Sequence, residues 1–516
     1  MNRAVFVAAG ILLSRTAGFI RLRVFAYYFG LSDPADAFNA AFRVPNFLQN
    51  MFGEGALSAS FIPVYAALVS KGDRREADRV AGAVLALLAL IVSVLVAVAV
   101  LATPQIVAGI APGFTGAKRE LAIQLTRVLF PGAGLLVLSA WCLGVLNSHH
   151  RFTLSYAAPV VWNACMVGTL LLFGRGATLP SLAYHLAWGS VVGSAAQFLA
   201  QIPVVLQVAP DLRVAWDTTS EHVRTVVRNF LPVFISRGVV QLSAYIDALL
   251  ASLLPTGAVT GITSAALIYT LPVSLFGISV AASELPAMAG AAALDTSGFS
   301  AIRARLDAGV RRIAFFVVPS SVGFLALGDI VAAAVLQTGR FTRADADYVW
   351  GILAGSSVGL VAMTLGRLYS STFYALRDPR TPLRFALIRV TVTTMLGYVF
   401  AIPLPHALGL DPRWGAAGLT ASAGMAGWIE MFLLRNGLRA RIGSVTMPVG
   451  FQLTLWASAI GAAAVGWGVK LLLPPMHPIF AAAAILGPYV LTYAALTLAL
   501  QVPEAQATLR RLLRRR

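Results

Sequence analysis

Charged residues are scarce in this chain. Lys, Arg, Asp and Glu make up 12% of its 516 residues, about half of the share that is usual in soluble domains. Hydrophobic residues make up 58%, and apolar runs long enough to cross a bilayer recur along the whole sequence. Strand-like alternation of polar and apolar residues is missing. The composition excludes a soluble globular domain and predicts an all-α polytopic membrane protein.

Cysteine and histidine are also rare. Cys142 and Cys165 both fall in apolar segments, which favours buried small side chains over a disulfide or a metal pair. The six histidines form no ligand set. The H-E-x-x-H, nucleophile-elbow and phosphate-loop patterns are missing as well. We therefore expect neither an enzyme nor a resident metal or cofactor.

Acidic residues are outnumbered, 21 against 39 basic ones, which gives a net charge of +18. Such a balance can indicate nucleic acid, but the basic residues cluster between the apolar runs, so no nucleic-acid partner is expected. One set of connectors and the tail carry 23 of them, and the alternate set carries six. The positive-inside rule then predicts that both termini are cytoplasmic. The basic tail, 502–516, either contacts anionic inner-leaflet lipid or is simply solvated. The six residues of the alternate set are Lys118, Arg119, Arg175, Arg340, Arg343 and Arg413.

The apolar runs predict fourteen spans, the second of which is long and is expected to bend near Gly53 and Gly55. Their approximate bounds are 4–29, 36–69, 78–102, 120–147, 153–173, 179–207, 225–254, 260–290, 308–328, 346–374, 382–402, 415–436, 447–473 and 479–501.

A weak internal repeat relates the two halves of the chain. "LLSRTAG" (12–18) resembles "FISRGVV" (234–240), and "VLNSHHRFTL" after the fourth span resembles "FYALRDPRTPL" after the tenth. The repeat predicts two six-helix lobes in parallel orientation, 1–207 and 222–436. Two extra helices, 447–501, and the tail follow. Lobes of this kind commonly enclose a central cavity that opens alternately to each side.

The first span holds three arginines, Arg15, Arg21 and Arg23. An arginine at the centre of a span costs roughly 2.5–3.5 kcal/mol on insertion scales. Arg15 lies about 17 Å into its helix, too deep to reach either surface easily. The guanidinium group suits phosphate because it binds bidentately and keeps its charge. These arginines therefore predict an anionic, phosphate-bearing ligand.

Further charged or polar residues occur inside other spans. Together with the first three arginines, the predicted substrate-binding set contains Asp36, Arg43, Asn46 and Arg237, and the candidate ion-coupling residues are Asp247 and Glu284. In the alternative interpretation, the arginines pair internally with Asp36, Glu54 or Asp247 and only hold helices together. Glu284 is equally compatible with a structural ion pair at the cytoplasmic interface.

At these residues the chain resembles the MurJ (MviN) family of lipid II flippases, in the multidrug/oligosaccharidyl-lipid/polysaccharide exporter superfamily. The matching stretches are "LSRTAGFIR" (13–21), "DAFNAAFRVPNFLQNMFGEGALSASFIPV" (36–64), "APGF" (111–114), "LNSHHRF" (146–152) and "FYALRDPRTP" (373–382).

The resemblance implies a multi-pass protein of the bacterial inner membrane that functions in peptidoglycan and cell-wall biogenesis. Such proteins move an undecaprenyl-diphosphate-linked precursor to the outer leaflet, driven by the membrane potential or by a Na+ or H+ gradient. The resemblance implies that Arg15, Arg21 and Asp36 line a cavity. It also implies that the lipid tail lies in a groove beside the last two spans, and that cell-wall synthesis proteins are possible partners.

The chain departs from the family pattern at several positions. Leu22, Gln49 and Leu267 stand where the family has charged residues. The eleventh and twelfth spans lack the acid-rich pattern of sodium-binding members, and Gly397 and Ala401 occupy the corresponding positions. We hypothesise that Arg237 replaces the arginine missing at Leu267. The alternatives are a flippase for another polyprenyl-diphosphate glycan, a cation-coupled exporter and a non-transporting membrane scaffold.

Overall fold

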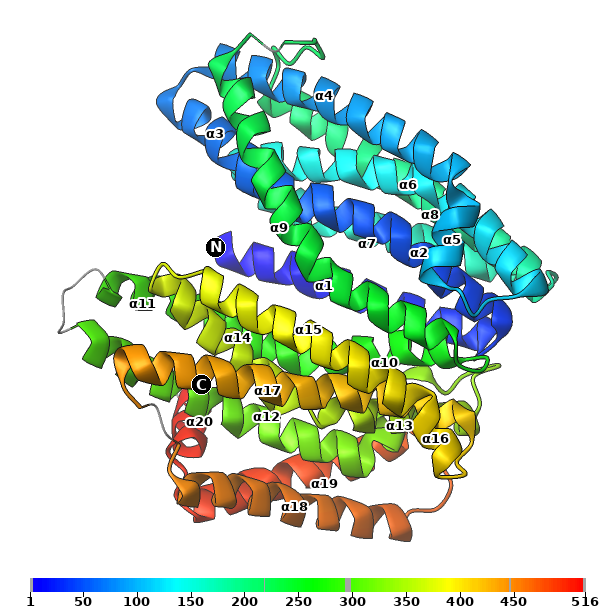
Figure 1. Ribbon diagram of the computed structural model, residues 1–516, viewed down its shortest axis with the longest axis vertical. Helices are drawn as coiled ribbons and strands as arrows, with labels where there is room; N and C mark the ends of the chain where they lie inside the picture. The colour runs from blue at the N-terminus through cyan, green and yellow to red at the C-terminus, as the bar shows by residue number, and fades with distance from the viewer. Residues whose placement is uncertain (1–2, 218, 293–297, 445–446, 514–516) are drawn as a thin grey trace. The chain divides into compact units, whose positions relative to one another are not determined.

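The computed structural model describes the chain except residues 1–2, 218, 293–297, 445–446 and 514–516 (Figure 1). Side chains within 53–55 and 235–244 also lie outside the described part. The chain is helical almost throughout, as its composition predicts. Its first helices are α1 (Arg3–Phe29), α2 (Asp33–Gln49), the π-helix η1 (Asn50–Leu57), α3 (Ser58–Lys71), α4 (Arg74–Leu101), α5 (Thr103–Ile110), α6 (Gly116–Ser148), α7 (Phe152–Phe173), α8 (Leu179–Val208) and α9 (Glu221–Ser252).

The second half of the chain continues the pattern. Its elements are α10 (Ala258–Pro272), the π-helix η2 (Val273–Ile278), α11 (Ser279–Ala292), α12 (Gly298–Leu336), α13 (Arg343–Ser357), α14 (Leu360–Ala375), α15 (Arg380–Ala401), α16 (Pro403–Ala407), the 3-10 helix η3 (Pro412–Trp414), α17 (Gly415–Ile442), α18 (Val449–Leu472), α19 (Pro478–Ala499) and α20 (Pro503–Leu513).

Each of the fourteen predicted spans coincides with one helix or with consecutive helical segments. Within the described part, nine helices are long and apolar enough to cross a membrane alone. The pair α13 and α14, bent by 44°, makes a tenth if it is counted as one span. The prediction of an all-α multi-pass membrane protein is confirmed. The full number of fourteen spans stays a prediction.

The chain divides into two compact units. Unit 1 contains Met1–Thr260 with Thr338–Phe341, and unit 2 contains Gly261–Gln337 with Thr342–Arg516. This division follows contacts and places α9 in unit 1. The lobes predicted from the repeat, 1–207 and 222–436, divide the chain by sequence similarity instead and stay a prediction.

Unit 1 is built around α6, which packs against α2, α4 and α8, while α1 packs on α7 (Figure 1). Its core contains Phe61, Tyr65, Trp141 and Cys142, all fully buried. Neither Cys142 nor Cys165 forms a disulfide, as the sequence predicts. The helices of this unit therefore enclose an apolar core.

In unit 2, α12 packs against α13, α14, α18 and α19, and α15 packs along α17 (Figure 1). The last two long helices, α18 and α19, lie side by side, and α19 is joined to α12 by hydroxyl groups. Tyr489 and Tyr493 donate to the carbonyl oxygens of Pro319 and Phe315 at 2.5 and 2.7 Å. These bonds satisfy two buried phenols, so α19 is a fixed part of unit 2.

Local sequence signals account for several helix ends. The hydroxyl of Ser32 accepts from the amide of Ala35 and begins α2, with Pro34 and two aspartates in the first turn. Thr342 and Asp345 form a reciprocal capping box at the start of α13. Gly72, in the left-handed conformation with φ 81°, ends α3.

Two backbone features recur at the distance of the sequence repeat. The π-helices η1 and η2 begin at Asn50 and Val273, which are 223 residues apart. Gly53 and Gly55 lie in η1, where the sequence predicts a bend. Such widened turns interrupt α-helical geometry and are frequent at functional sites. The same interruption therefore occurs in both halves of the chain.

The second recurrent feature is the turn that follows α6 and α14. His150 and Arg377, 227 residues apart, adopt positive φ values of 60° and 59°. The next amide in each turn donates to a carbonyl oxygen five residues back, at 2.9 Å in both cases. This is the Schellman ending of a helix, which is unusual without glycine.

A buried carboxylate joins three helices of unit 2. Asp329 of α12, whose side chain is 3% exposed, accepts from Arg343 of α13 and from Lys470 of α18, the latter at 2.8 Å. Removal of one partner from a buried charged set leaves the others without compensation. Asp329 therefore fixes the connections of α13 and α18 to α12.

We expect Asp329→Ala to lower the free energy of unfolding by about 1.5–3 kcal/mol, the usual worth of hydrogen bonds to charged groups. Thermal unfolding of the detergent-solubilised protein measures this. The control is Asp347→Ala, which removes an exposed partner of the same Arg343 at 3.1 Å. An exposed pair is worth about 0–1 kcal/mol. Equal losses in the two variants would contradict the role assigned to Asp329.

Candidate substrate site

The arginines of α1 fall in different environments. Arg15 is exposed, and Arg21 and Arg23 are partly buried. Arg15 and Arg21 are six residues apart, so they are separated by about 120° around the helix. The three arginines therefore spread over a wide face of the helix rather than along a narrow seam. The predicted wide polar face of the helix has an exposed part at Arg15 and a more enclosed part at Arg21.

An aromatic ring supports Arg21. Its guanidinium carbon lies 4.7 Å from the ring centroid of Trp162 on α7, and Nη1 lies 3.6 Å from the sulfur of Met166. The indole nitrogen of Trp162 donates to the hydroxyl of Ser190 on α8 at 3.2 Å, which orients the ring. A cation over an indole face is worth about 0.5–2 kcal/mol, more when desolvated. The contacts that hold Arg21 in place are thus with an aromatic ring and a sulfur atom, and not with a carboxylate.

Trp162 itself ends a row of stacked rings that runs across α1, α2 and α7. Neighbouring centroids in this row lie 4.6 to 6.0 Å apart. Aromatic pairs at such distances add about 0.5–1.5 kcal/mol beyond the area they bury. The row makes the support of Arg21 stiff. Its members, in order, are Phe29, Phe25, Phe38, Phe42 and Trp162.

Asp36 is fully buried at the start of α2 and accepts four hydrogen bonds. Lys118 of α6 donates at 2.9 Å, the amide of Gly257 at 2.8 Å, and the amide and hydroxyl of Thr260 at 2.9 and 2.8 Å. The amide of Thr260 lies in the first turn of α10 and that of Gly257 just before it, at the helix end whose orphan donors and positive dipole favour a carboxylate. Asp36 therefore caps α10.

Lys118 completes this cluster by also contacting Asp33 at 2.8 Å, and Asp33 accepts from the hydroxyl of Thr256 at 2.7 Å. The sequence places Asp36 among the substrate-binding residues. The structure places it in a saturated internal network, with Lys118 as its cationic partner rather than one of the α1 arginines. A substrate contact for Asp36 stays a prediction.

Arg43 lies near the residues that the alternative interpretation assigns to it. It borders a very small cavity together with Tyr245 of α9, and both Asp247 and Tyr245 act on it electrostatically. Phe47 packs edge-on against Tyr245 at 5.1 Å. Arg43 and Asp247 thus form a link between α2 and α9. Substrate binding by Arg43 and ion coupling by Asp247 stay predictions.

Four other positions that the sequence singles out lie in unit 1. Asn46 is exposed on α2. The side chains of Arg237 on α9 and Glu54 in η1 lie outside the described residues, so the hypothesis that Arg237 replaces a missing arginine stays a prediction. Arg23 borders a separate pocket with Tyr27 and Tyr28.

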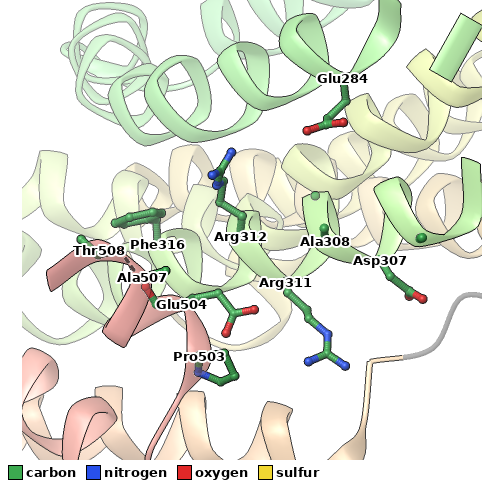
Figure 2. Close-up of a pocket in the computed structure, with 12 residues that line it drawn as sticks. Glu284, Asp307, Ala308, Arg311, Arg312, Phe316, Pro503, Glu504, Ala507 and Thr508 are labelled. Atoms are coloured by element: carbon green, nitrogen blue, oxygen red, sulfur yellow. Dashed lines mark hydrogen bonds between the residues drawn. The ribbon is translucent and has the colours of Figure 1, made fainter. Parts of the chain in front are cut away.

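Glu284, the second candidate ion-coupling residue, lies in unit 2 at a pocket of about 620 Å³ between α11, α12 and α20 (Figure 2). It contacts Arg305 at 3.3 Å. Asp307, Arg311 and Glu504 border the same pocket, so acidic and basic groups are mixed around it. The contact between Glu284 and Arg305 is the structural ion pair that the sequence analysis gave as the alternative role of Glu284. Ion coupling through Glu284 stays a prediction.

Sequence reasoning missed two arginines of unit 2. Arg389 on α15 contacts Glu430 on α17 at 2.9 Å, and both side chains are mostly buried. Arg367 on α14 is exposed and, like Arg389, acts electrostatically on Tyr269 of α10. Both lie inside apolar runs, the signal that identified Arg15. Tyr269 is two residues from Leu267, so positive charge reaches this part of α10 from neighbouring helices.

These features together define a class of protein: a multi-pass α-helical membrane transporter that carries arginines, some exposed and some partly buried, within its spanning helices. The fold is that of known transporters. A structure described as lipid II flippase MurJ in an inward closed conformation aligns with a TM-score of 0.78, 23% identity, and coverage of 96% of this chain and 98% of that one. An inward-facing MATE transporter of the MOP superfamily aligns with a TM-score of 0.68 at 18% identity, over 82% and 95%.

Sequence comparison gives the family. The sequence model of the family described as lipid II flippase MurJ matches residues 25–490. The lipid II flippase MurJ of Burkholderia cenocepacia is 31% identical over 90% of this chain and 88% of its own length. The probable lipid II flippase MurJ of Haemophilus influenzae is 29% identical over 83% and 84%. The chain belongs to the lipid II flippase MurJ family, which is a family of transporters and not of enzymes.

We expect Asp36→Asn to lower the free energy of unfolding by about 1.5–3 kcal/mol, because an amide cannot accept from all four donors and leaves Lys118 with only the half-exposed carboxylate of Asp33. Thermal unfolding of the detergent-solubilised protein measures this. Asp33→Asn is the matched control, since its side chain is 53% exposed and shares the same lysine. A loss at Asp33 as large as the loss at Asp36 would contradict the capping role.

Proposed function

We propose that this chain moves lipid II, an undecaprenyl-diphosphate glycolipid, from the inner to the outer leaflet of the bacterial cytoplasmic membrane by alternating access. The observation that carries the proposal is the pair Arg15 and Arg21 on α1. Arg21 is fixed on Trp162 while Arg15 is exposed on the same helix. Two guanidinium groups suit a diphosphate, which offers oxygens for more than one bidentate contact.

The support of Arg21 explains how the site tolerates its own charge. A carboxylate partner would neutralise the guanidinium and compete with phosphate for its donors. An aromatic face attracts the cation yet occupies none of its N–H groups. The ring therefore lowers the cost of a partly buried charge and takes up none of the N–H donors, of which Nη1 contacts the sulfur of Met166. This is a preorganised arrangement, in which less is lost on binding.

The orientation belongs to the same proposal. The excess of basic residues in one set of connectors supports cytoplasmic N- and C-termini, and so places the α1–α2 connector on the outer side. Substrate binding to one state would shift the population toward closure. In this proposal Asp247 is the candidate residue for coupling to Na+ or H+. Glu284 is better suited to its ion pair with Arg305.

We expect Arg15→Ala and Arg21→Ala each to reduce lipid II translocation in proteoliposomes by about 10- to 100-fold, since each removes hydrogen bonds to a charged group. Arg21→Lys should restore part of the activity because it keeps the charge without the planar fork. Arg119→Ala is the control, because it removes an exposed arginine of α6 in the same unit. Full translocation by both α1 variants would refute the proposed site.

We expect depletion of the protein in its host to accumulate the lipid-linked precursor on the cytoplasmic side, because no route to the outer leaflet remains. Lipid extraction with leaflet-specific labelling measures this. A flippase for another polyprenyl-diphosphate glycan would accumulate that glycan instead. A non-transporting scaffold would accumulate neither, and that result would contradict transport altogether.

A further inference from the structure

A pocket of about 680 Å³ lies in unit 1 at the end of α1 that precedes the α1–α2 connector. It is separate from Trp162 and from the Asp36 network. Its volume falls within the range of roughly 300–1,000 Å³ that is usual for small-molecule sites. Three segments border it: the last turns of α1, the end of α7 and the connector between α12 and α13. The lining residues that matter below are Arg23, Tyr27, Tyr28, Arg175 and Arg340.

The pocket is held together by main-chain contacts. The amide of Arg340 donates to the carbonyl oxygen of Tyr27 at 2.9 Å. This close approach depends on two glycines with positive φ, Gly30 at 55° and Gly339 at 54°. A Cβ at Gly339 would collide with Tyr27, and one at Gly30 would collide with the carbonyl of Arg340. The connector therefore has a defined seat on α1, so the pocket is a built feature of unit 1.

The charges around the pocket have one sign. Arg23 comes from α1, Arg175 from the residues after α7, and Arg340 from the connector. Among the described residues that line the pocket, none is acidic. On the proposed orientation Arg175 and Arg340 are two of the six basic residues in the connectors assigned to the outer side. Their convergence with Arg23 favours a multiply charged anion, because each guanidinium can bind phosphate oxygens bidentately.

The surroundings indicate the depth of the pocket in the membrane. Leu171 and Leu172, at the end of α7, are 58% and 80% exposed, and Tyr27 is 48% exposed. Exposed apolar residues next to tyrosines and arginines are typical of the membrane–water boundary, where aromatic rings gather. The pocket therefore lies at the level of outer-leaflet headgroups, and its anion is one that a lipid carries.

We propose that this pocket is an exit-side site that binds the diphosphate of the polyprenyl glycolipid after it reaches the outer leaflet and before it diffuses away. The inference rests on the proposed function and on its orientation. It also assigns a role to Arg23, the third arginine of α1, which the proposed Arg15–Arg21 site does not use. Arg15 and Arg21 would contact the diphosphate before transport, and Arg23, Arg175 and Arg340 after it.

The test compares binding of undecaprenyl diphosphate to the full-length protein in phosphatidylcholine nanodiscs, counted by native mass spectrometry. The variant is Arg175→Gln with Arg340→Gln, which removes two side-chain charges and keeps the main-chain bond of Arg340 to Tyr27. The matched control is Arg119→Gln with Arg127→Gln, two exposed arginines of α6 in the same unit. Both doubles are measured in the wild-type background and in an Arg15→Ala/Arg21→Ala background, which isolates the second site.

We expect the Arg175/Arg340 variant to weaken binding in the second background by at least about tenfold, and the control to leave it unchanged. Equal binding by variant and control would overturn the exit site. Inorganic diphosphate that binds as tightly as the lipid would assign the pocket to free diphosphate and overturn the lipid assignment. Phosphatidylglycerol that binds as tightly as undecaprenyl diphosphate would overturn the requirement for a diphosphate.

Lipid II translocation by the wild-type protein is measured in parallel, so that failure of the proposed exit site can be distinguished from failure of the proposed function. Translocation that proceeds while the pocket variant binds like the control would leave the proposed function standing and overturn the exit site. Binding that depends on Arg175 and Arg340 in a protein that translocates no lipid II would overturn the proposed function.

Discussion

The cost of placing charge inside an apolar helix governs this structure. Every arginine or carboxylate within a span must be compensated, and the described residues show two ways of doing so. Acidic groups meet cations: Asp36 meets Lys118, Asp329 meets Arg343 and Lys470, and Glu430 meets Arg389. Arg21 instead rests on an aromatic ring. In the first arrangement the charges pair with one another and hold helices together. In the second the cation stays without a carboxylate partner and can bind an anionic ligand.

This difference separates structural from functional charges. Asp36 fills all of its acceptor positions on α6 and α10, so its present arrangement fixes the helix geometry. The ring that supports Arg21 is itself oriented by Ser190 and backed by a row of aromatic residues. Packing around Trp162 therefore positions the Arg21 cation without neutralising its charge. Such an arrangement is expected of a site that must bind an anion and later release it.

The sequence predicts the fold well because its signals are local. Apolar run length locates each helix, and Gly53 and Gly55 mark the break at η1, whereas its counterpart η2, 223 residues later, was not predicted. It predicts the site less fully, because partners depend on tertiary contacts. Nothing near Arg21 in sequence indicates Trp162, 141 positions away, and nothing near Asp36 indicates Gly257. Arg367 and Arg389 carried the same signal as Arg15 and were overlooked, while Arg43 proves to have the acidic neighbour Asp247 and Glu284 the basic neighbour Arg305.

The central claim is that the arginines of α1 bind the diphosphate of the cargo. An experimental structure of the full-length protein with lipid II in a nanodisc tests it most directly. The account predicts diphosphate density within about 2.7–2.9 Å of the guanidinium nitrogens of Arg15 and Arg21, with Arg21 still on Trp162. Diphosphate density elsewhere, with both guanidinium groups turned to carboxylates of the protein, would contradict it.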